Sequence, residues 1–316
     1  MAAEDLVIGV DGGGTKTVAW LARLEEKASE EILGRGQAGP GNPRAAGFEV
    51  AQANIEAAIA AAFADAKLPA RTAAAACFGL AGAGRAAEQG RIADWAKSRR
   101  IAERVTVTGD AELVLAAASP ENVGIALICG TGSLAWGRNA AGAVARCGGW
   151  GYLVGDEGSA YAIARAGLQA AVRAADGRGE ATRLLEAFQN ELGARRPEQL
   201  IDAVYAPEMT RERLAALAMI VFAEAGDDPL AKAIVTTAAE ELATLVRVLS
   251  HRLRMDAGSY RLALSGSVIL QQALLRERML ASLTQEMAAP GNVVCVSEPV
   301  RGALALARTA SPESKS

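Results

Sequence analysis

The chain of 316 residues is long enough for two domains, since a domain averages about 150 residues. Hydrophobic residues make up 51% of it and aromatic residues only 4%, which predicts a globular protein with an aliphatic core. The net charge of −3 argues against a nucleic-acid or anionic-membrane surface, which would need a basic stripe. The single histidine, His251, excludes Ser-His-Asp and Cys-His catalysis unless it takes part itself. An enzyme with this sequence is therefore expected to use a carboxylate as its acid or base.

The cysteines and the N-terminal segment favour a cytoplasmic protein. The four cysteines show neither zinc-site spacing nor the density of a disulfide framework. The first residues, MAAED, are acidic where a signal peptide would be basic. No apolar run approaches the roughly 20 residues that a membrane-spanning helix requires.

The first part of the chain predicts strands that alternate with helices. Short apolar runs bounded by Gly, Pro or charged residues predict the strands, and longer Ala-rich stretches predict the helices. The predicted strands are 6–10, 17–24, 31–36, 73–80 and 104–108, and the predicted helices are 48–66, 85–99 and 111–118. The Gly- and Pro-rich segment 38–47 between them predicts a loop.

The same order restarts after Ser119-Pro120. The predicted strands are 122–129, 134–138, 143–146, 260–264 and 292–296, with a largely helical stretch at 157–254, a helix after Ser267, a last helix at 300–309 and a disordered tail after Ala310. Aligning Gly12 with Gly130 places Thr15 on Ser133, which indicates an internal repeat. We therefore expect an α/β protein with two related domains, 1–119 plus 300–316 and 120–299, the second with a helical insertion.

The segment Gly9–Thr17 is the first of four glycine-rich turns at strand ends, where ligands of α/β sheets bind. It lacks the GK[ST] step of a P-loop, and an apparent strand follows it instead of a helix, so a P-loop is excluded. Its glycines let backbone N–H groups approach an anion, with Thr15 and Thr17 as further donors. Asp11 beside a phosphate would need a cation between them, which makes it a candidate Mg²⁺ ligand, directly or through water. The alternative is a tight hairpin with an Asp cap.

The other three turns are less specific. Gly79–Gly84 runs into a loose dinucleotide-binding pattern with Asp110 as a ribose ligand, but the hairpin at the N-terminus disfavours a Rossmann fold. Gly130–Ser133 corresponds by the repeat to the first turn, so the two could hold a polyphosphate from both sides. Ser265–Ser267 lies between a strand and a helix, where it either lets a flat ring lie against the backbone or only caps the helix.

Two segments carry carboxylates suited to chemistry. Asp110 follows a strand and precedes a helix, so it is either an N-cap or a general base for a hydroxyl that attacks a γ-phosphoryl group. The run Cys147–Ser159 holds five glycines with Trp150, Asp156 and Glu157. Carboxylates that accept paired hydroxyl groups beside glycine backbone suit a polyhydroxylated sugar. The alternative is a helix capped at Asp156 with Trp150 in the core.

Taken together, these segments resemble the BadF/BadG-type ATPases of the sugar kinase/Hsp70/actin superfamily, and within that family the N-acetylglucosamine kinases. The resemblance runs from Leu6 to about Ala307. Its motifs are DGGGTKT at 11–17, GNP at 41–43, GDA at 109–111, GTGS at 130–133, GGWG at 148–151, GDEGSAY at 155–161 and SGS at 265–267.

The resemblance implies two RNase H-like, actin/hexokinase-type domains around a central cleft, with the last helix packed on the first domain. It also implies which residues bind each substrate. The implied ATP-binding residues are Gly12, Gly13, Gly14, Thr15, Lys16, Thr17, Gly130, Thr131, Gly132, Ser133, Ser265, Gly266 and Ser267. Asp110 would be the catalytic base, and the implied sugar-binding residues are Asn42, Asp110, Gly149, Trp150, Gly151 and Asp156.

The implied activity is transfer of the γ-phosphate of ATP, with Mg²⁺, to O6 of N-acetylglucosamine. The implied protein is a cytoplasmic homodimer without nucleic-acid or membrane partners. One alternative is a glucosamine kinase with the free amino sugar as substrate. Another is an ATP-hydrolysing activator of a partner enzyme, but Cys129 and Cys147 do not fall in the iron–sulfur pattern of that branch. A sugar-sensing repressor would need DNA-binding helices before the first strand.

Overall fold

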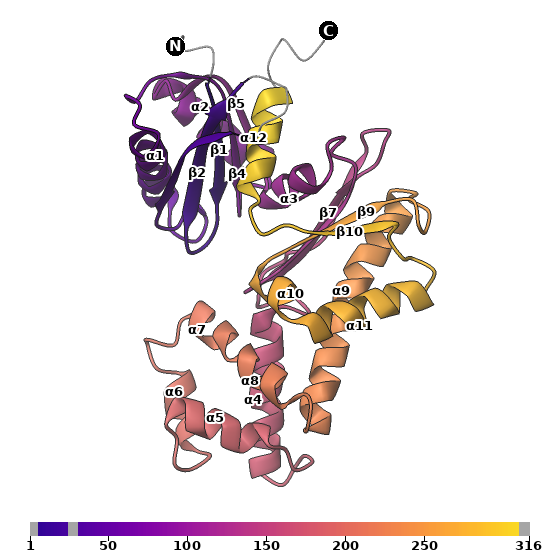
Figure 1. Cartoon of the computed structure of the whole chain (residues 1–316). Helices are drawn as coiled ribbons and strands as arrows, with labels where there is room; N and C mark the ends of the chain where they lie inside the picture. Colours follow the sequence, from indigo (N-terminus) through magenta and orange to yellow (C-terminus); the bar gives the residue numbers. More distant parts are fainter. Residues whose placement is uncertain (1–5, 25–30, 310–316) are drawn as a thin grey trace. The chain divides into compact units, whose positions relative to one another are not determined.

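The computed structural model describes residues 6–24 and 31–309, and within them the chain is α/β, as predicted (Figure 1). The chain divides at Val123/Gly124 and at Cys295/Val296 into two compact units. We call the described residues of 6–123 and 296–309 unit 1, and residues 124–295 unit 2. The predicted domain boundaries, after 119 and before 300, lie within a few residues of these divisions. The tail predicted to be disordered lies outside the described residues.

Unit 1 contains a mixed five-stranded sheet. Its strands are β1 (Leu6–Gly12), β2 (Thr17–Arg23), β3 (Ile32–Ala38), β4 (Ala73–Leu80) and β5 (Ala102–Thr108), in the order β3-β2-β1-β4-β5. Strands β1, β2 and β3 are antiparallel neighbours, whereas β4 and β5 run parallel to β1. Helices cover both faces, so neighbouring residues of β1 enter different cores: Ile8 packs on one side of the sheet and Val7 on the other.

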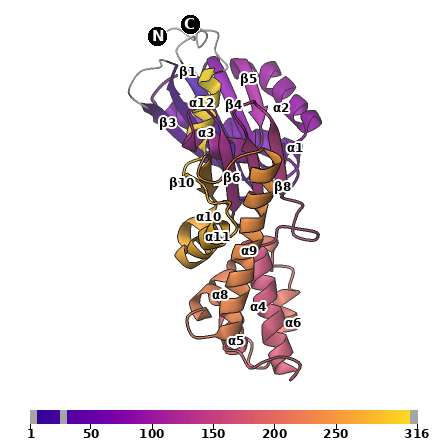
Figure 2. The same cartoon turned by 90° about the vertical axis from the view of Figure 1, so that its right-hand side faces the viewer.

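The helices of unit 1 lie in two layers (Figures 1 and 2). Helices α1 (Phe48–Asp65) and α2 (Ala86–Ser98) pack on the Ile8 side, and α3 (Asp110–Ala118) and α12 (Val300–Thr309) pack on the Val7 side. Gly36 lets α1 approach the edge of the sheet, because a Cβ there would lie 1.9 Å from the carbonyl oxygen of Ala58. Helix α12 thus returns the end of the chain to unit 1.

Unit 2 repeats the sheet of unit 1 strand for strand. Its strands are β6 (Gly124–Cys129), β7 (Ser133–Arg138), β8 (Val144–Gly148), β9 (Arg261–Ser265) and β10 (Asn292–Cys295), in the order β10-β9-β6-β7-β8. Again the first three strands are antiparallel neighbours, and the last two run parallel to the first. The internal repeat predicted from the glycine turns is therefore confirmed at the level of topology.

The alignment of the two first turns needs a correction. In unit 1 the strands pair up to Gly12 and Thr17, and in unit 2 up to Cys129 and Ser133. The N–H of Gly13 donates to the Lys16 carbonyl at 2.9 Å, and that of Gly130 to the Gly132 carbonyl at 3.0 Å. The first turn is one residue longer, so Thr17, and not Thr15, corresponds to Ser133.

The helical stretch of unit 2 was predicted as one region and consists of several helices. They are α4 (Ala160–Ala175), α5 (Leu184–Leu192), α6 (Gln199–Val204), α7 (Arg211–Ala216), α8 (Ala218–Glu224) and α9 (Pro229–Arg252), followed after β9 by α10 (Ser267–Gln271) and α11 (Ala273–Gln285). Helix α9 is the long helix that runs alongside α4 and α8 (Figure 2). Its apolar face packs with side chains of β6, α4 and α8 in one core. No helix in the described ranges is both long and apolar enough to cross a membrane.

The single histidine and the four cysteines lie in different environments. His251 is exposed near the end of α9. Cys77 and Cys129 are buried in strands, and burial raises the pKa of the Cys129 thiol to about 12. Cys147 is half-buried and Cys295 is exposed. Since both buried thiols stay protonated at neutral pH, they act as small apolar core residues.

Candidate functional site

The first glycine turn of unit 1 is held in place from behind by two other loops. The carbonyl of Gly12 accepts the N–H of Ala81 at 2.9 Å, and the carbonyl of Gly13 accepts the N–H groups of Gly41 and Asn42 at 3.0 and 3.1 Å. A Cβ on Gly12 would lie 2.5 Å from the Leu80 side chain, so this close packing requires glycine. The tip of the turn, 14–16, is exposed. The fold therefore presents a fixed loop whose outer residues can meet a ligand.

Thr17 ties this turn to the neighbouring loop. Its side chain is buried, and its hydroxyl donates to the carbonyl of Gly39 at 2.8 Å. The one hydroxyl proton of Thr17 is thus used inside the protein, while Thr15 and Lys16 are exposed. A contact between Thr17 and ATP stays a prediction.

Asp11 and Lys16 line one pocket of about 360 Å³ in unit 1, together with Arg35 and residues at the start of α12. Burial and, after it, the negative charge of Asp110 raise the pKa of Asp11 to about 7, while Lys16 lowers it. Ionisation of the Asp11 carboxyl at neutral pH therefore costs free energy in the folded protein. A cation bound next to it would remove that cost.

The residues present fit Mg²⁺ that arrives with a nucleotide. Asp11 offers a hard oxygen ligand, and among the described residues no three His, Cys, Asp or Glu side chains gather as a metal site of their own. Mg²⁺ is commonly bound by one or two carboxylates, with water and substrate phosphates as its other ligands. Asp11 is the residue that would hold it here.

Asp110 is the first residue of α3 and is not its N-cap, which is Gly109. Its Oδ1 accepts the N–H of Ala111 at 3.0 Å, and the residue is half-buried. Its effect on the pKa of Asp11 shows that the two carboxylates interact. Asp110 also lies at the N-terminus of a helix, a position that favours negative charge.

Asn42 lies in the loop that contacts the first turn. Its Oδ1 accepts the N–H groups of Arg44 at 2.9 Å and Ala45 at 3.3 Å. Gly82 must be glycine beside it, because a Cβ there would lie 2.5 Å from the same oxygen. The side chain is therefore oriented, and what it can offer to a sugar is the donor group, its amide nitrogen.

In unit 2 the structure brings two of the predicted ATP-binding segments together. A Cβ on Gly130 would lie 3.7 Å from the hydroxyl of Ser267, so the turn 130–133 lies beside Ser265–Ser267. Gly266 has a φ of 101°, and a Cβ on it would lie 2.4 Å from the carbonyl oxygen of Cys129. Only glycine allows both this backbone conformation and this approach.

The glycine-rich run 148–158 is bonded to the same turn. The N–H of Gly149 donates to the carbonyl of Ser133 at 2.9 Å, and the hydroxyl of Ser133 donates to the carbonyl of Glu157 at 2.6 Å. The guanidinium of Arg146 also donates to the Gly149 carbonyl. Trp150 is 75% exposed, so the alternative that placed this side chain in the core is wrong.

Asp156 connects the run 148–158 to the turn 130–133. It is buried, its φ is +60°, and its Oδ1 accepts the N–H of Gly151 at 3.2 Å. A Cβ on Gly132 would lie 2.6 Å from its Oδ2. Burial raises the pKa of Asp156, and the Gly151 N–H opposes that shift. The N-cap of α4 is Ser159, so Asp156 does not cap the helix. A left-handed, buried, non-glycine carboxylate is typical of a functional position.

Sequence reasoning missed Arg211, the first residue of α7. Its Nη2 lies 3.7 Å from Oδ2 of Asp156, and its guanidinium lies over the ring of Tyr152 at 5.3 Å. Tyr152 in turn contacts the ring of Tyr161 edge-on, with centroids 4.9 Å apart. Nothing in the sequence around Arg211 distinguishes it from an ordinary arginine on a surface helix.

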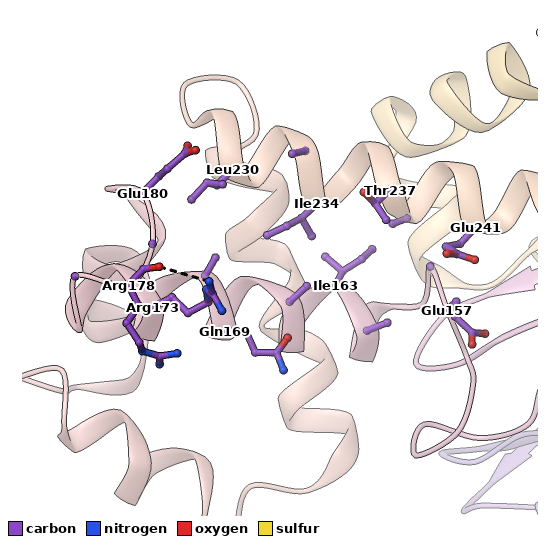
Figure 3. A pocket seen from close by; sticks show the side chains of 18 residues that line it. Glu157, Ile163, Gln169, Arg173, Arg178, Glu180, Leu230, Ile234, Thr237 and Glu241 are labelled. Atoms are coloured by element: carbon purple, nitrogen blue, oxygen red, sulfur yellow. Dashed lines mark hydrogen bonds between the residues drawn. The ribbon is translucent and has the colours of Figure 1, made fainter.

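A separate pocket of about 910 Å³ lies in unit 2 between α4 and α9 (Figure 3). Ile163 and Ile234 are apolar side chains in its middle, and Arg173 lies toward one end with Glu157 toward the other. Two residues of the run 148–158, Glu157 and Gly158, also line this pocket. None of the residues predicted to bind ATP or sugar lines it, so it lies outside the candidate site.

Two named proteins are similar to this chain in sequence. An N-acetylmuramic acid/N-acetylglucosamine kinase of Clostridium acetobutylicum is 34% identical over 264 residues, which cover 83% of this chain and 85% of that protein. An N-acetyl-D-glucosamine kinase of Dictyostelium discoideum is 26% identical over 318 residues, which cover 96% and 98%.

Solved structures show the same fold. A candidate N-acetylglucosamine kinase from Chromobacterium violaceum superposes with a TM-score of 0.77 at 26% identity, covering 96% of this chain and 99% of that one. A ROK family glucokinase from Streptomyces griseus, at 18% identity and the same coverage, has a TM-score of 0.58. The fold is therefore that of the actin-like and hexokinase-type kinases, as the sequence motifs implied. The sequence model of one family, the BadF/BadG/BcrA/BcrD ATPases, matches residues 8–307. Because that match spans nearly the whole chain, the protein belongs to the BadF/BadG/BcrA/BcrD ATPase family.

Proposed function

We propose that the protein is an amino-sugar kinase that transfers the γ-phosphate of ATP to O6 of N-acetylglucosamine. The names of the two sequence relatives support a kinase of this substrate class, and the family supports ATP as the phosphate donor. The observation that carries the proposal is the position of Asp110. It begins α3 without capping it, is half-buried, and interacts with the second carboxylate, Asp11.

Asp110 is the general base of the proposed reaction. It accepts the proton of the O6 hydroxyl while O6 forms a bond to the γ-phosphorus atom. The bond from that phosphorus to the β–γ bridging oxygen breaks, and ADP leaves with the electron pair. The products are the sugar 6-phosphate, ADP and the proton held by Asp110.

The remaining site residues bind and orient the two substrates. We assign the nucleotide to the turns 12–17, 130–133 and 265–267. Asn42, with its amide nitrogen as donor, the exposed ring of Trp150, the backbone of Gly149 and Gly151, and the Asp156 carboxylate would hold the sugar. Asp11 would hold Mg²⁺, which when bound neutralises negative charge on the phosphates.

A coupled assay of ADP release tests this proposal. The wild-type protein is given ATP with N-acetylglucosamine, glucosamine, N-acetylmuramate or glucose, or with no sugar. We expect turnover to depend on the sugar and to be fastest with N-acetylglucosamine. A preference for glucosamine would replace the proposed substrate with the free amino sugar. Equal rates with and without every sugar would contradict the kinase and favour an ATP-hydrolysing activator.

The homodimer and the cytoplasmic location are proposed on the same resemblance. Light scattering coupled to gel filtration tests the dimer, which requires twice the 32.5 kDa of one chain. A measured mass of about 32.5 kDa, that of one chain, at micromolar protein concentration would contradict the homodimer.

A further inference from the structure

The guanidinium of Arg211 is held in place but has little to bind within the protein. Its Nε is buried and has no hydrogen-bond acceptor among the described residues. The 3.7 Å between Nη2 and Oδ2 of Asp156 is an ion-pair distance longer than a hydrogen bond. The side chain is 38% exposed, so a ligand can reach it. Five fixed donors with so few acceptors are suited to a planar anion such as a carboxylate or a phosphoryl group.

The surroundings of Arg211 orient it toward the candidate site. The guanidinium lies over the ring of Tyr152, which Tyr161 contacts edge-on. The guanidinium also borders Gly132, since a Cβ on Gly132 would lie 3.2 Å from Nη2. Arg211 therefore lies next to the turn assigned to phosphate and next to Asp156, which is assigned to the sugar.

We propose that Arg211 is a further catalytic residue, whose guanidinium binds the γ-phosphoryl group of ATP during its transfer. The inference rests on the proposed function, because the γ-phosphoryl group is what passes between the phosphate turn and the sugar. As the bond to the bridging oxygen breaks and the bond to O6 forms, negative charge shifts on the phosphoryl oxygens. A preorganised arginine stabilises that charge, and arginines in this role accelerate phosphoryl transfer by large factors.

Three variants test this role. Arg211→Ala removes the guanidinium, and Arg211→Lys keeps the charge without the planar donors. The control is Arg213→Ala, two residues along the same helix, where the exposed side chain donates to the Glu208 carbonyl at 3.1 Å. The control loses the same charge from α7 without touching the candidate site.

The expected kinetic result is a loss of kcat. For Arg211→Ala we expect kcat to fall roughly 10²–10³-fold, with partial recovery in Arg211→Lys and wild-type rates in Arg213→Ala. The Michaelis constant for the sugar should change little. Unchanged kcat in Arg211→Ala would overturn the proposal. So would a loss confined to N-acetylmuramate, because the arginine would then bind the sugar's carboxylate.

A binding experiment separates this inference from the proposed function. The affinities of each variant for ADP and for a non-hydrolysable ATP analogue are compared by calorimetry, with Mg²⁺ and without sugar. We expect Arg211→Ala to weaken the analogue about tenfold or more and ADP less than about twofold, a difference of about 1 kcal/mol between the two ligands. Equal weakening of both would show a structural role and overturn the proposal. This comparison decides the role of Arg211 even if no sugar is phosphorylated, and Arg211→Gln replaces the alanine variant if that variant does not fold.

Discussion

At the scale of single residues, we propose different tasks for two interacting carboxylates. Asp110 begins α3 and accepts the N–H of Ala111, whereas Asp11 lies near the end of β1 and desolvation raises its pKa to about 7. We assign proton abstraction to Asp110 and cation binding to Asp11, whose raised pKa makes its ionisation costly at neutral pH. This proposed division of roles needs no histidine, and His251 is exposed near the end of α9.

Replacement of Asp110 tests its role as the base. Asp110→Asn keeps the shape of the side chain but cannot accept the O6 proton, so we expect kcat to fall by roughly 10²–10⁴-fold. ADP affinity measured by calorimetry should stay within about twofold of wild type. The matched control is Asp94→Asn, the same change at an exposed position of α2, which should leave kcat unchanged. Near-normal kcat in Asp110→Asn would leave Asp110 with only a structural role.

In the absence of divalent cations, we expect Asp11→Asn to be more stable than wild type by an amount that depends on pH. In the unfolded chain the Asp11 carboxyl ionises near 3.8, but in the folded chain near 7. Below about pH 3 the carboxyl is protonated in both states, and the raised pKa has no effect. As the pH rises from 4 to 7 the unfolded state loses its proton first, so the folded protein loses stability relative to Asp11→Asn, on the order of 2–4 kcal/mol by pH 7–8.

Thermal unfolding in EDTA at pH 5, 6, 7 and 8 measures this difference. We expect the melting temperature of Asp11→Asn to exceed that of wild type by an amount that grows up to about pH 7 and then levels off. A constant difference across the series would mean that Asp11 has an ordinary pKa in the folded protein.

At the scale of elements, the candidate site consists of turns that close packing makes glycine-dependent. Gly266 combines a φ of 101° with a Cβ position 2.4 Å from the Cys129 carbonyl oxygen. Gly142 has a φ of 82°, but a Cβ there would have no neighbour within 4 Å. Comparing alanine substitutions at Gly142 and Gly266 therefore separates the free-energy cost of a positive φ from that of a steric clash.

We expect Gly142→Ala to lower the free energy of unfolding by about 1 kcal/mol. Gly266→Ala should cost roughly 1–3 kcal/mol more, because the strand β6 must shift to relieve the contact. It should also weaken ATP-analogue binding, whereas Gly142→Ala should not. Urea unfolding and calorimetry measure the two effects. Equal costs and equal affinities in the two variants would show that the close approach at Gly266 is unimportant.

The helices, strands and turns also show which parts of this fold can be predicted from the amino-acid sequence. Buried strands such as β4 are continuous apolar runs, and the glycine turns carry their own conformational signal, so both were predicted at nearly their observed positions. The helical stretch was recognised, but not its division at Leu217, where α7 ends and α8 begins, because the apolar pattern continues across that residue. Thr15 was aligned with Ser133 because sequence does not reveal that one turn is a residue longer. Arg211 was missed because only tertiary packing brings α7 to Asp156.

At the scale of the whole molecule, one topology is used twice. Each unit has three antiparallel strands followed by two parallel ones, and each presents a glycine turn after its first strand. Unit 1 carries Asp11 and Asp110, whereas unit 2 carries Asp156 and Arg211. Arg211 lies in the helical insertion of unit 2. The helical insertion of unit 2 therefore contributes to chemistry in our account.

The central claim is that this chain phosphorylates an amino sugar at O6 with Asp110 as the base. The most direct measurement is ³¹P and ¹³C nuclear magnetic resonance of a mixture of the protein, ATP, Mg²⁺ and N-acetylglucosamine. We predict stoichiometric ADP and a phosphomonoester whose phosphorus couples to C6 of the sugar, formed by wild type and suppressed in Asp110→Asn. Release of inorganic phosphate with the sugar left unmodified, or equal product from the two proteins, would contradict the account.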